Sequence, residues 1–169
     1  MDVFEAVRTV LAVRRYAERS VPADVVRRIV EAGRLSASAQ NLQPWHFVVV
    51  EERTTIRRIS EIITTGHYAA GAALAIAVTI VKDKRIAVSD GSRAIQNMIL
   101  VAWSEGVGSN WMGFGRMPEI EALLGVPETH QTLAVVAFGY PAEEIGRGKK
   151  QRKPVNEIAS RERFGTPFA

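Results

Sequence analysis

The chain of 169 residues contains no cysteine. This absence excludes a disulfide framework, thiolate-bound zinc, iron–sulfur ligation and thiol redox chemistry. It also fits a reducing compartment, and the cytoplasm is therefore the expected location.

A long unbroken hydrophobic run is also missing. The first residues, MDVFEAVRTVLAVRRY, carry Glu5 and Arg8 where a signal peptide would be uniformly apolar, so no export signal is expected. The longest weakly polar stretch, residues 69–81, falls short of the roughly 20 apolar residues that a membrane span requires. We therefore predict a core strand there and no membrane partner.

Several catalytic signatures are absent. His46, His67 and His130 are isolated, with no His-Glu-x-x-His pairing, and no metal site is expected. Ser92 lacks the Gly-x-Ser-x-Gly frame of a serine hydrolase. There is no Walker sequence, and GVGSNW places Trp111 where the dinucleotide fingerprint needs its third glycine. A nicotinamide domain of the Rossmann kind is thereby excluded.

The residues that are present favour one folded domain. Hydrophobic residues make up 47% and charged residues 24%, a balance typical of globular proteins, and a chain of this length can bury one core. The net charge is +4. Basic residues gather at Arg14 and Arg15 and again in GRGKKQRKP, where Lys150 and Arg152 lie. Converging cations could hold a phosphate, although a solvated helix end and a basic tail remain the alternative.

Hydrophobic periodicity predicts an α+β fold. Helices are expected over 2–13, from Pro22, over 54–63, from Ser89 or Asp90 to Glu105, and over 118–124, with buried strands at 46–51, 74–81 and 133–140 and a short strand within 106–115. The helix ending at Glu105 has almost no polar face, so a second copy of the chain is expected to cover it. Residues from Pro154 onward show no strong helical or strand period.

Two loops could contact a ligand. In SASAQNLQPW, Ser38 and Asn41 offer hydroxyl and amide groups at the mouth of a strand. The glycines of GFG, residues 113–115, leave the backbone open to close approach by a flat molecule. An ordinary loop and an ordinary turn remain the alternatives.

Taken in order, these features resemble the nitroreductase family of flavoproteins. The resemblance covers nearly the whole chain through the Arg-Arg segment, the proline-started helix, SASAQNLQPW, the long apolar helix, GSNWMG and the closing GYPAEE with KKQRKP. It implies an α/β/α sandwich with a central mixed β-sheet, an intertwined homodimer, and FMN at the dimer interface. Residues 1–169 would form a single FMN-binding domain, with 154–169 as an arm laid over the partner subunit.

The same resemblance implies roles for particular residues. Basic residues from both ends would meet the FMN phosphate, Ser38 and Asn41 would reach the flavin from the other subunit, and the backbone near Gly113 would face the ring. Tyr16 stands where the family often has Ser, and Ala37 where it usually has Pro, which predicts weaker FMN affinity. The expected cofactor-binding set is Arg14, Arg15, Tyr16, Ser38, Ala39, Asn41, Gln43, Met112, Gly113, Phe114, Lys150 and Arg152.

The implied activity is hydride transfer from NAD(P)H through FMN to a nitroaromatic, a quinone or a similar small acceptor. The flavin would carry the chemistry, so no side chain is expected to act as a catalytic acid or base. Alternatives on the same fold are a flavin-consuming or deazaflavin-related enzyme and a flavin-binding sensor without turnover. A nucleic-acid-binding module using residues 147–153 is disfavoured because GRGKKQRK contains no aromatic residue.

Overall fold

A four-stranded sheet forms the centre of the computed structural model, which describes residues 1–113, 115–145 and 150–168. The strands are β1 (Trp45–Val50), β2 (Leu74–Val81), β3 (Gly108–Met112) and β4 (His130–Gly139), in the order β1-β2-β4-β3. All neighbouring strands pair antiparallel. The expectation of a mixed sheet therefore does not hold for these strands.

Parallel pairing among the described residues is limited to the isolated bridge between Ala12 and Ser109. Here the segment that follows the first helix runs along the outer edge of β3, and the N–H of Val13 donates to the carbonyl of Ser109 at 2.9 Å. A mixed sheet would need a parallel strand at this edge, whereas the described chain supplies only this one parallel bridge. Beyond Ser109, no strand of the described chain pairs with the outer edge of β3.

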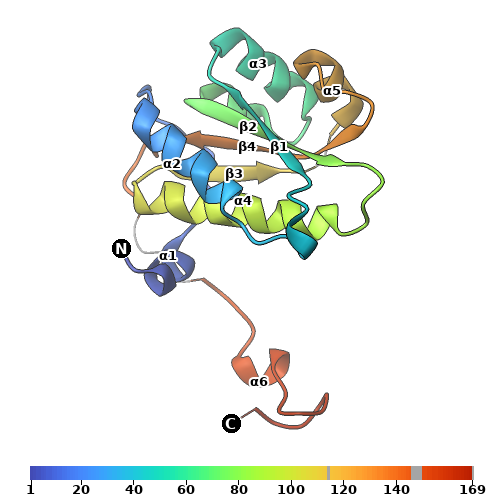
Figure 1. Ribbon diagram of the computed structural model, residues 1–169. Helices are drawn as coiled ribbons and strands as arrows, with labels where there is room; N and C mark the ends of the chain where they lie inside the picture. The colour runs from blue at the N-terminus through green and yellow to red at the C-terminus, as the bar shows by residue number, and fades with distance from the viewer. Residues whose placement is uncertain (114, 146–149, 169) are drawn as a thin grey trace.

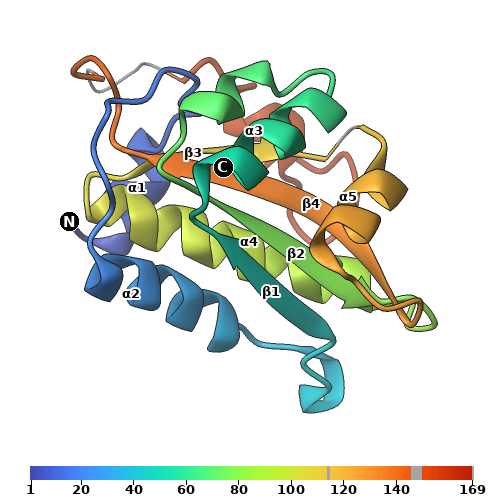
Figure 2. The same ribbon diagram turned by 90° about the horizontal axis from the view of Figure 1, so that it is seen from above.

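Helices cover both faces of the sheet (Figures 1 and 2). On one face, α2 (Ala23–Arg34) and α4 (Ala87–Ser104) pack their apolar stripes against alternate residues of β2 and β4. On the other face, α3 (Arg53–Ile62) and α5 (Met117–Leu124) cover the intervening residues of the same strands. The expected α/β/α sandwich and α+β class are thereby confirmed.

Strand β2 is the most completely buried element. Leu74, Ile76 and Val78 face the core under α2 and α4, while Ala75 and Ala77 face the core under α3 and α5. A strand buried on both faces shows a continuous apolar run rather than alternation, which is why its bounds were predicted correctly as 74–81.

Helix α4 begins earlier than the sequence predicted. Its N-cap position is Ile86, so Asp90 lies within the first turn rather than at the cap. The fully buried Asp90 carboxylate accepts the N–H of Ala39 at 3.1 Å and lies 3.3 Å from the Arg93 guanidinium. The residue that resembled a helix cap instead ties the 38–43 loop to α4.

Helix α1 (Val3–Thr9) is shorter than the expected 2–13. The Asp2 side chain accepts the N–H of Glu5 at 2.7 Å, which confirms the predicted N-cap. Val10 leaves the helical conformation, because the following residues pair with the edge of β3. The Trp103 indole donates to the Thr9 hydroxyl at 2.9 Å and fastens α1 to α4.

The C-terminal segment, described over residues 150–168, lies outside the sandwich, below α1 in the view of Figure 1. It contains one short helix, α6 (Val155–Ile158), and a bridge between Ser160 and Pro167, where the sequence predicted no element. Most of its side chains are exposed, including that of Phe164. On α1, the Phe4 side chain is also 76% exposed.

No helix in the part of the chain that the structure describes combines the length and hydropathy of a bilayer-spanning segment.

Candidate functional site

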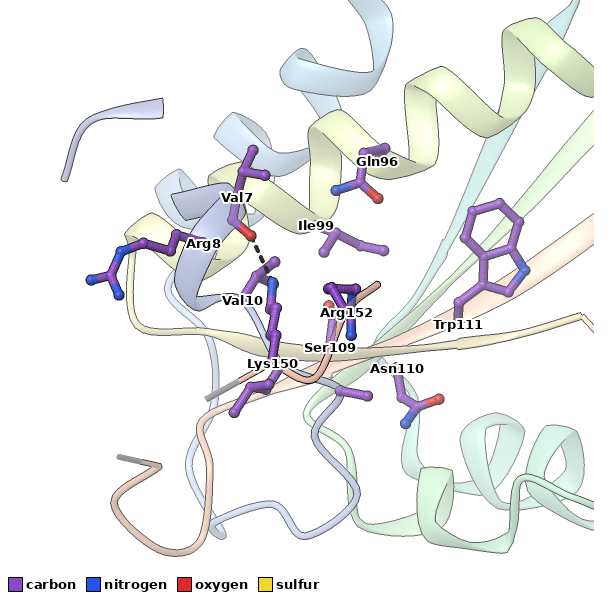
Figure 3. Close-up of a pocket in the computed structure, with 12 residues that line it drawn as sticks. Val7, Arg8, Val10, Gln96, Ile99, Ser109, Asn110, Trp111, Lys150 and Arg152 are labelled. Atoms are coloured by element: carbon purple, nitrogen blue, oxygen red, sulfur yellow. Dashed lines mark hydrogen bonds between the residues drawn. The ribbon is translucent and has the colours of Figure 1, made fainter. Parts of the chain in front are cut away.

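A cavity of about 860 Å³ opens beside the outer edge of β3 (Figure 3). It is bounded by the end of α1, the extended segment after it, the middle of α4, β3 and the first described residues of the C-terminal segment. The two ends of the chain therefore meet at one cavity. Its lining residues are Val7, Arg8, Val10, Leu11, Ala12, Gln96, Ile99, Ser109, Asn110, Trp111, Lys150 and Arg152.

Two predicted cofactor-binding cations line this cavity. The Lys150 ammonium donates to the carbonyl of Val7 at 2.6 Å, shown as a dashed line in Figure 3. Burial, and next the positive charge of Arg152, lower the pKa of Lys150 below its ordinary value. Arg8 turns away from the other labelled side chains in Figure 3 and pairs with Glu5 at 2.8 Å. Lys150 and Arg152 thus make one wall that an anion would neutralise.

Neighbouring residues of β3 present different chemistry to the cavity. Trp111 and Asn110 leave the strand on opposite sides, as alternation along a strand requires (Figure 3). The Trp111 side chain remains 39% exposed, and its ring offers an apolar surface to a planar ligand. Asn110, by contrast, is only 5% exposed, and its amide nitrogen is buried.

Asn110 belongs to a polar cluster that the sequence analysis did not identify. The Tyr68 hydroxyl donates to Asn110 Oδ1 at 2.8 Å. The buried Asn110 Nδ2 has no hydrogen-bond partner among the described residues. The Arg14 guanidinium lies 5.7 Å from the centroid of the Tyr68 ring. The signal for this cluster was a polar Asn within a short strand, and Tyr68 is 42 residues away from it in sequence.

Arg14 and Arg15 do not line the large cavity. Both contribute to a smaller cavity of about 230 Å³ with Pro141, Glu143 and neighbouring residues, and Ala12 borders both spaces. The exposed Arg15 pairs with Glu143 at 2.8 Å. Within one chain, the basic residues from the two ends therefore lie in two cavities that share Ala12.

Tyr16 follows Arg14 and Arg15 in the sequence, but its side chain points into the protein. Its hydroxyl donates to the carbonyl of Val13 at 2.8 Å. Burial, and next the neighbouring Tyr68, raise the pKa of Tyr16 well above its ordinary value, despite the opposing charge of Arg14. The phenol is therefore neutral across the physiological range.

The 38–43 loop is strained and internally bonded. Gln40, Asn41 and Gln43 have positive φ angles of 52°, 55° and 47°, a conformation that costs non-glycine residues free energy. The Ser38 hydroxyl accepts the N–H of Gln43 at 3.0 Å, and Asp90 accepts that of Ala39. These bonds, together with the flanking helix and strand, fix the loop in one shape.

This loop does not reach the large cavity of its own chain. Figure 2 shows the loop at the opposite end of α4 from α1, and none of its residues lines the cavity. Met112 is buried in the core under α3 and α5, with Gly113 following it at the end of β3. Phe114, the remaining predicted residue, lies outside the described residues. Among the residues that the structure describes, no group of three or more His, Asp or Glu side chains could hold a metal ion.

The geometry defines an α/β/α protein with a cationic, aromatic-lined cavity at a sheet edge. The family model described as the nitroreductase family matches residues 8–81 and 66–140. The chain belongs to the nitroreductase family.

Known relatives and solved structures agree with this membership. A protein of Methanothermobacter thermautotrophicus, provisionally named an NADH dehydrogenase/NAD(P)H nitroreductase, is 36% identical over 154 residues, which cover 86% of this chain and 81% of that protein.

A crystal structure from Bacteroides thetaiotaomicron with the same provisional name superposes with a TM-score of 0.88 at 24% identity, covering 96% of this chain and 98% of that one. An FMN-dependent nitroreductase from Clostridium difficile R20291 gives a TM-score of 0.86 at 22% identity, covering 95% and 99%. These two likenesses establish the fold.

Proposed function

We propose that the chain is an FMN-dependent oxidoreductase that takes hydride from NAD(P)H and reduces a nitroaromatic, a quinone or a similar small acceptor. The observation that carries this proposal is the cavity that Lys150, Arg152, Asn110 and Trp111 line together, where Asn110 Nδ2 is buried without a partner. Family membership and the names of the relatives, one an NAD(P)H nitroreductase and one an FMN-dependent enzyme, support it.

The residues of the cavity fit FMN. Lys150 and Arg152 would neutralise the phosphate, and the buried Nδ2 of Asn110 is a donor that needs an acceptor. Trp111 offers an aromatic surface, and about 860 Å³ lies within the range of cofactor sites. When bound, FMN supplies hydride acceptance and donation, whereas the protein supplies position and electrostatics.

A second copy of the chain would complete each site. The 38–43 loop is preorganised but lies at the far end of α4, so Ser38, Ala39, Asn41 and Gln43 could contact only the cofactor of another subunit. Exposed apolar residues of α1 and half-buried ones of α4, including Phe4 and Leu100, provide a surface for such a partner. We therefore propose a homodimer with two FMN sites.

The C-terminal segment fits the same arrangement. Residues 154–168 make a short helix and a turn whose apolar side chains, Ile158 and Phe164 among them, are exposed in the single chain. We propose that residues 154–169 form an arm that packs over the partner subunit, while residues 1–169 remain one domain. Arg14, Arg15 and Gly113 would then complete the cofactor contacts at the subunit interface.

The test is the absorbance spectrum of the purified protein. We expect flavin bands, either as isolated or after addition of FMN, and their loss on anaerobic addition of NADH or NADPH. Recovery of the bands on addition of menadione or a nitroaromatic compound would complete the cycle. Protein that shows no flavin absorbance even with added FMN would contradict the proposal.

Other functions make different predictions in the same assays. A flavin-consuming enzyme would convert reduced FMN to a new product under oxygen, which chromatography would detect. A sensor would be reduced once by NADPH and would not turn over with menadione. A nucleic-acid-binding arm would show affinity that falls steeply with salt, but the bond from Lys150 to the carbonyl of Val7 disfavours it because this cation is directed into the cavity.

A further inference from the structure

The amide of Asn110 is an unusual feature of the cavity. In the described part of the chain, the buried side-chain polar atoms without a partner are Asn110 Nδ2 and Thr132 Oγ1. A hydroxyl can act as donor or acceptor by rotating, whereas an amide nitrogen can only donate. A buried donor without an acceptor is costly, and such groups in native proteins generally bond to an ordered water, an ion or a bound ligand.

Tyr68 occupies one end of the amide. Its hydroxyl donates to Asn110 Oδ1 at 2.8 Å, so the carbonyl end is occupied and the nitrogen is left over. Tyr68 is half-buried, and the Arg14 guanidinium lies 5.7 Å from its ring centroid. The cluster therefore connects Arg14 to a residue that lines the large cavity.

The positive charge of the cavity and a free amide N–H group both suit a ligand that accepts hydrogen bonds. Lys150 and Arg152 line the same space as Asn110, and the side chains of all three carry N–H donors. An amide turned the other way would leave an unpartnered carbonyl oxygen, which repels the oxygen atoms of an anionic ligand. Holding the amide with its nitrogen free therefore favours ligands rich in acceptor oxygens.

We propose that Asn110 Nδ2 donates a hydrogen bond to an oxygen of the cofactor, and that Tyr68 is a positioning residue that fixes the amide in this orientation. This inference rests on the proposed FMN function. Asn110 contacts the ligand directly, whereas Tyr68 acts through Asn110. The acceptor is an oxygen of the phosphate or of the ribityl-flavin portion.

The experiment measures FMN dissociation constants of the apoprotein by quenching of flavin fluorescence. We expect Asn110→Ala to weaken binding about tenfold or more, because a hydrogen bond and a matched donor are lost, and Tyr68→Phe to weaken it several-fold. Because Tyr68 acts through Asn110, the double variant should bind no more weakly than Asn110→Ala alone.

A matched control and a second variant separate this role from folding. Tyr140 also has an arginine over its ring, with Arg19 3.9 Å from the centroid, and no hydrogen bond joins it to Asn110. Tyr140→Phe should leave FMN affinity unchanged. Asn110→Asp keeps the shape of the side chain and can accept the Tyr68 hydroxyl, but cannot donate from the free position, so it should bind FMN more weakly than Asn110→Ala. Urea unfolding of each apoprotein checks that it folds.

A comparison of riboflavin binding with FMN binding identifies which part of the cofactor accepts the hydrogen bond. If the acceptor belongs to the phosphate, Asn110→Ala weakens only FMN binding; if it belongs to the ribityl-flavin portion, riboflavin binding weakens by the same factor. Unchanged FMN affinity in folded Asn110→Ala and Asn110→Asp would overturn the inference, and additive losses in the double variant would overturn the role of Tyr68. Failure of the wild-type protein to bind FMN would instead overturn the proposed function.

Discussion

Lys150 is the cation that the structure holds most closely in the large cavity. Its pKa is lowered by burial and by Arg152, so it loses its proton at a lower pH than an ordinary lysine. The charged form predominates below that pKa and attracts phosphate, while the neutral form above it does not. Anion binding and protonation of Lys150 therefore favour each other.

We expect FMN affinity to be constant near neutral pH and to fall as the pH rises through the lowered pKa of Lys150. The phosphate does not contribute to this fall, because its second pKa is about 6 and it is already fully ionised. Lys150→Arg should keep its charge and remove the alkaline loss. Fluorescence titrations from neutral to alkaline pH measure both proteins, and identical pH profiles would contradict a role for Lys150.

Asp90 is expected to stabilise both the fold and the strained loop. Asp90→Ala removes the acceptor for the N–H of Ala39 and leaves Arg93 without its carboxylate, so the free energy of unfolding should fall by about 1–3 kcal/mol. Hydrogen exchange at the Ala39 amide should accelerate more than exchange in β2. Arg93→Gln is the control, because it removes the ion pair and keeps the loop bond. Unchanged exchange at Ala39 in Asp90→Ala would exclude the anchoring role.

Among single residues, the sequence predicted some members of the site and missed others. Lys150 and Arg152 were identified because basic residues are conspicuous, and both line the large cavity. Tyr68 and Asn110 were missed because their hydrogen bond joins residues that are distant in sequence. The roles of Arg14 and Ser38 remain predictions, since a single chain places neither in that cavity.

Between elements, the contact of β3 with the segment after α1 positions the cavity. A Cβ atom added to Gly108 would lie 2.3 Å from Cγ2 and 2.8 Å from Cβ of Val13. Val13 is β-branched, buried and bonded to Ser109, so it cannot move without shifting its backbone. A glycine at this position allows the 10–13 segment to lie against the sheet edge.

Gly108→Ala should lower the free energy of unfolding by about 1–3 kcal/mol through overpacking. It should also weaken FMN binding, because Ala12 and Val10 of the displaced segment line the cavity. The matched control is Gly71→Ala, since no atom lies within 4 Å of a Cβ added there. Urea unfolding and FMN titration measure the two effects. Equal stability of the two variants would show that the segment adjusts freely.

Element types were more predictable than element ends. The bounds of β2 followed from a continuous apolar run, and α5 ends at Gly125, whose φ of 66° suits glycine. The predicted end of α1 was wrong because pairing of the next residues with β3 overrides a helical apolar pattern. The start of α4 was wrong because Asp90 serves a tertiary contact instead of a cap.

For the whole molecule, the exposed C-terminal segment predicts how subunits are held together. Removing residues 154–169 should leave the sandwich folded, because no core residue of the sandwich lies within this range. The truncated protein retains Lys150 and Arg152. We expect its dimer to dissociate at higher protein concentration than that of the full chain, which sedimentation or light scattering would measure. An unchanged dimer dissociation constant would contradict the arm, and a strictly monomeric full chain would contradict the dimer.

The position of the cavity also bears on how the protein is made. All strands of the sheet are complete once Gly139 has been synthesised, but the cavity needs Lys150 and Arg152 beside residues from the start of the chain. The strands can therefore pair without the anion wall, whose two cations are added to the growing chain after the last strand. Cofactor binding at this wall cannot precede synthesis of residues 150–152.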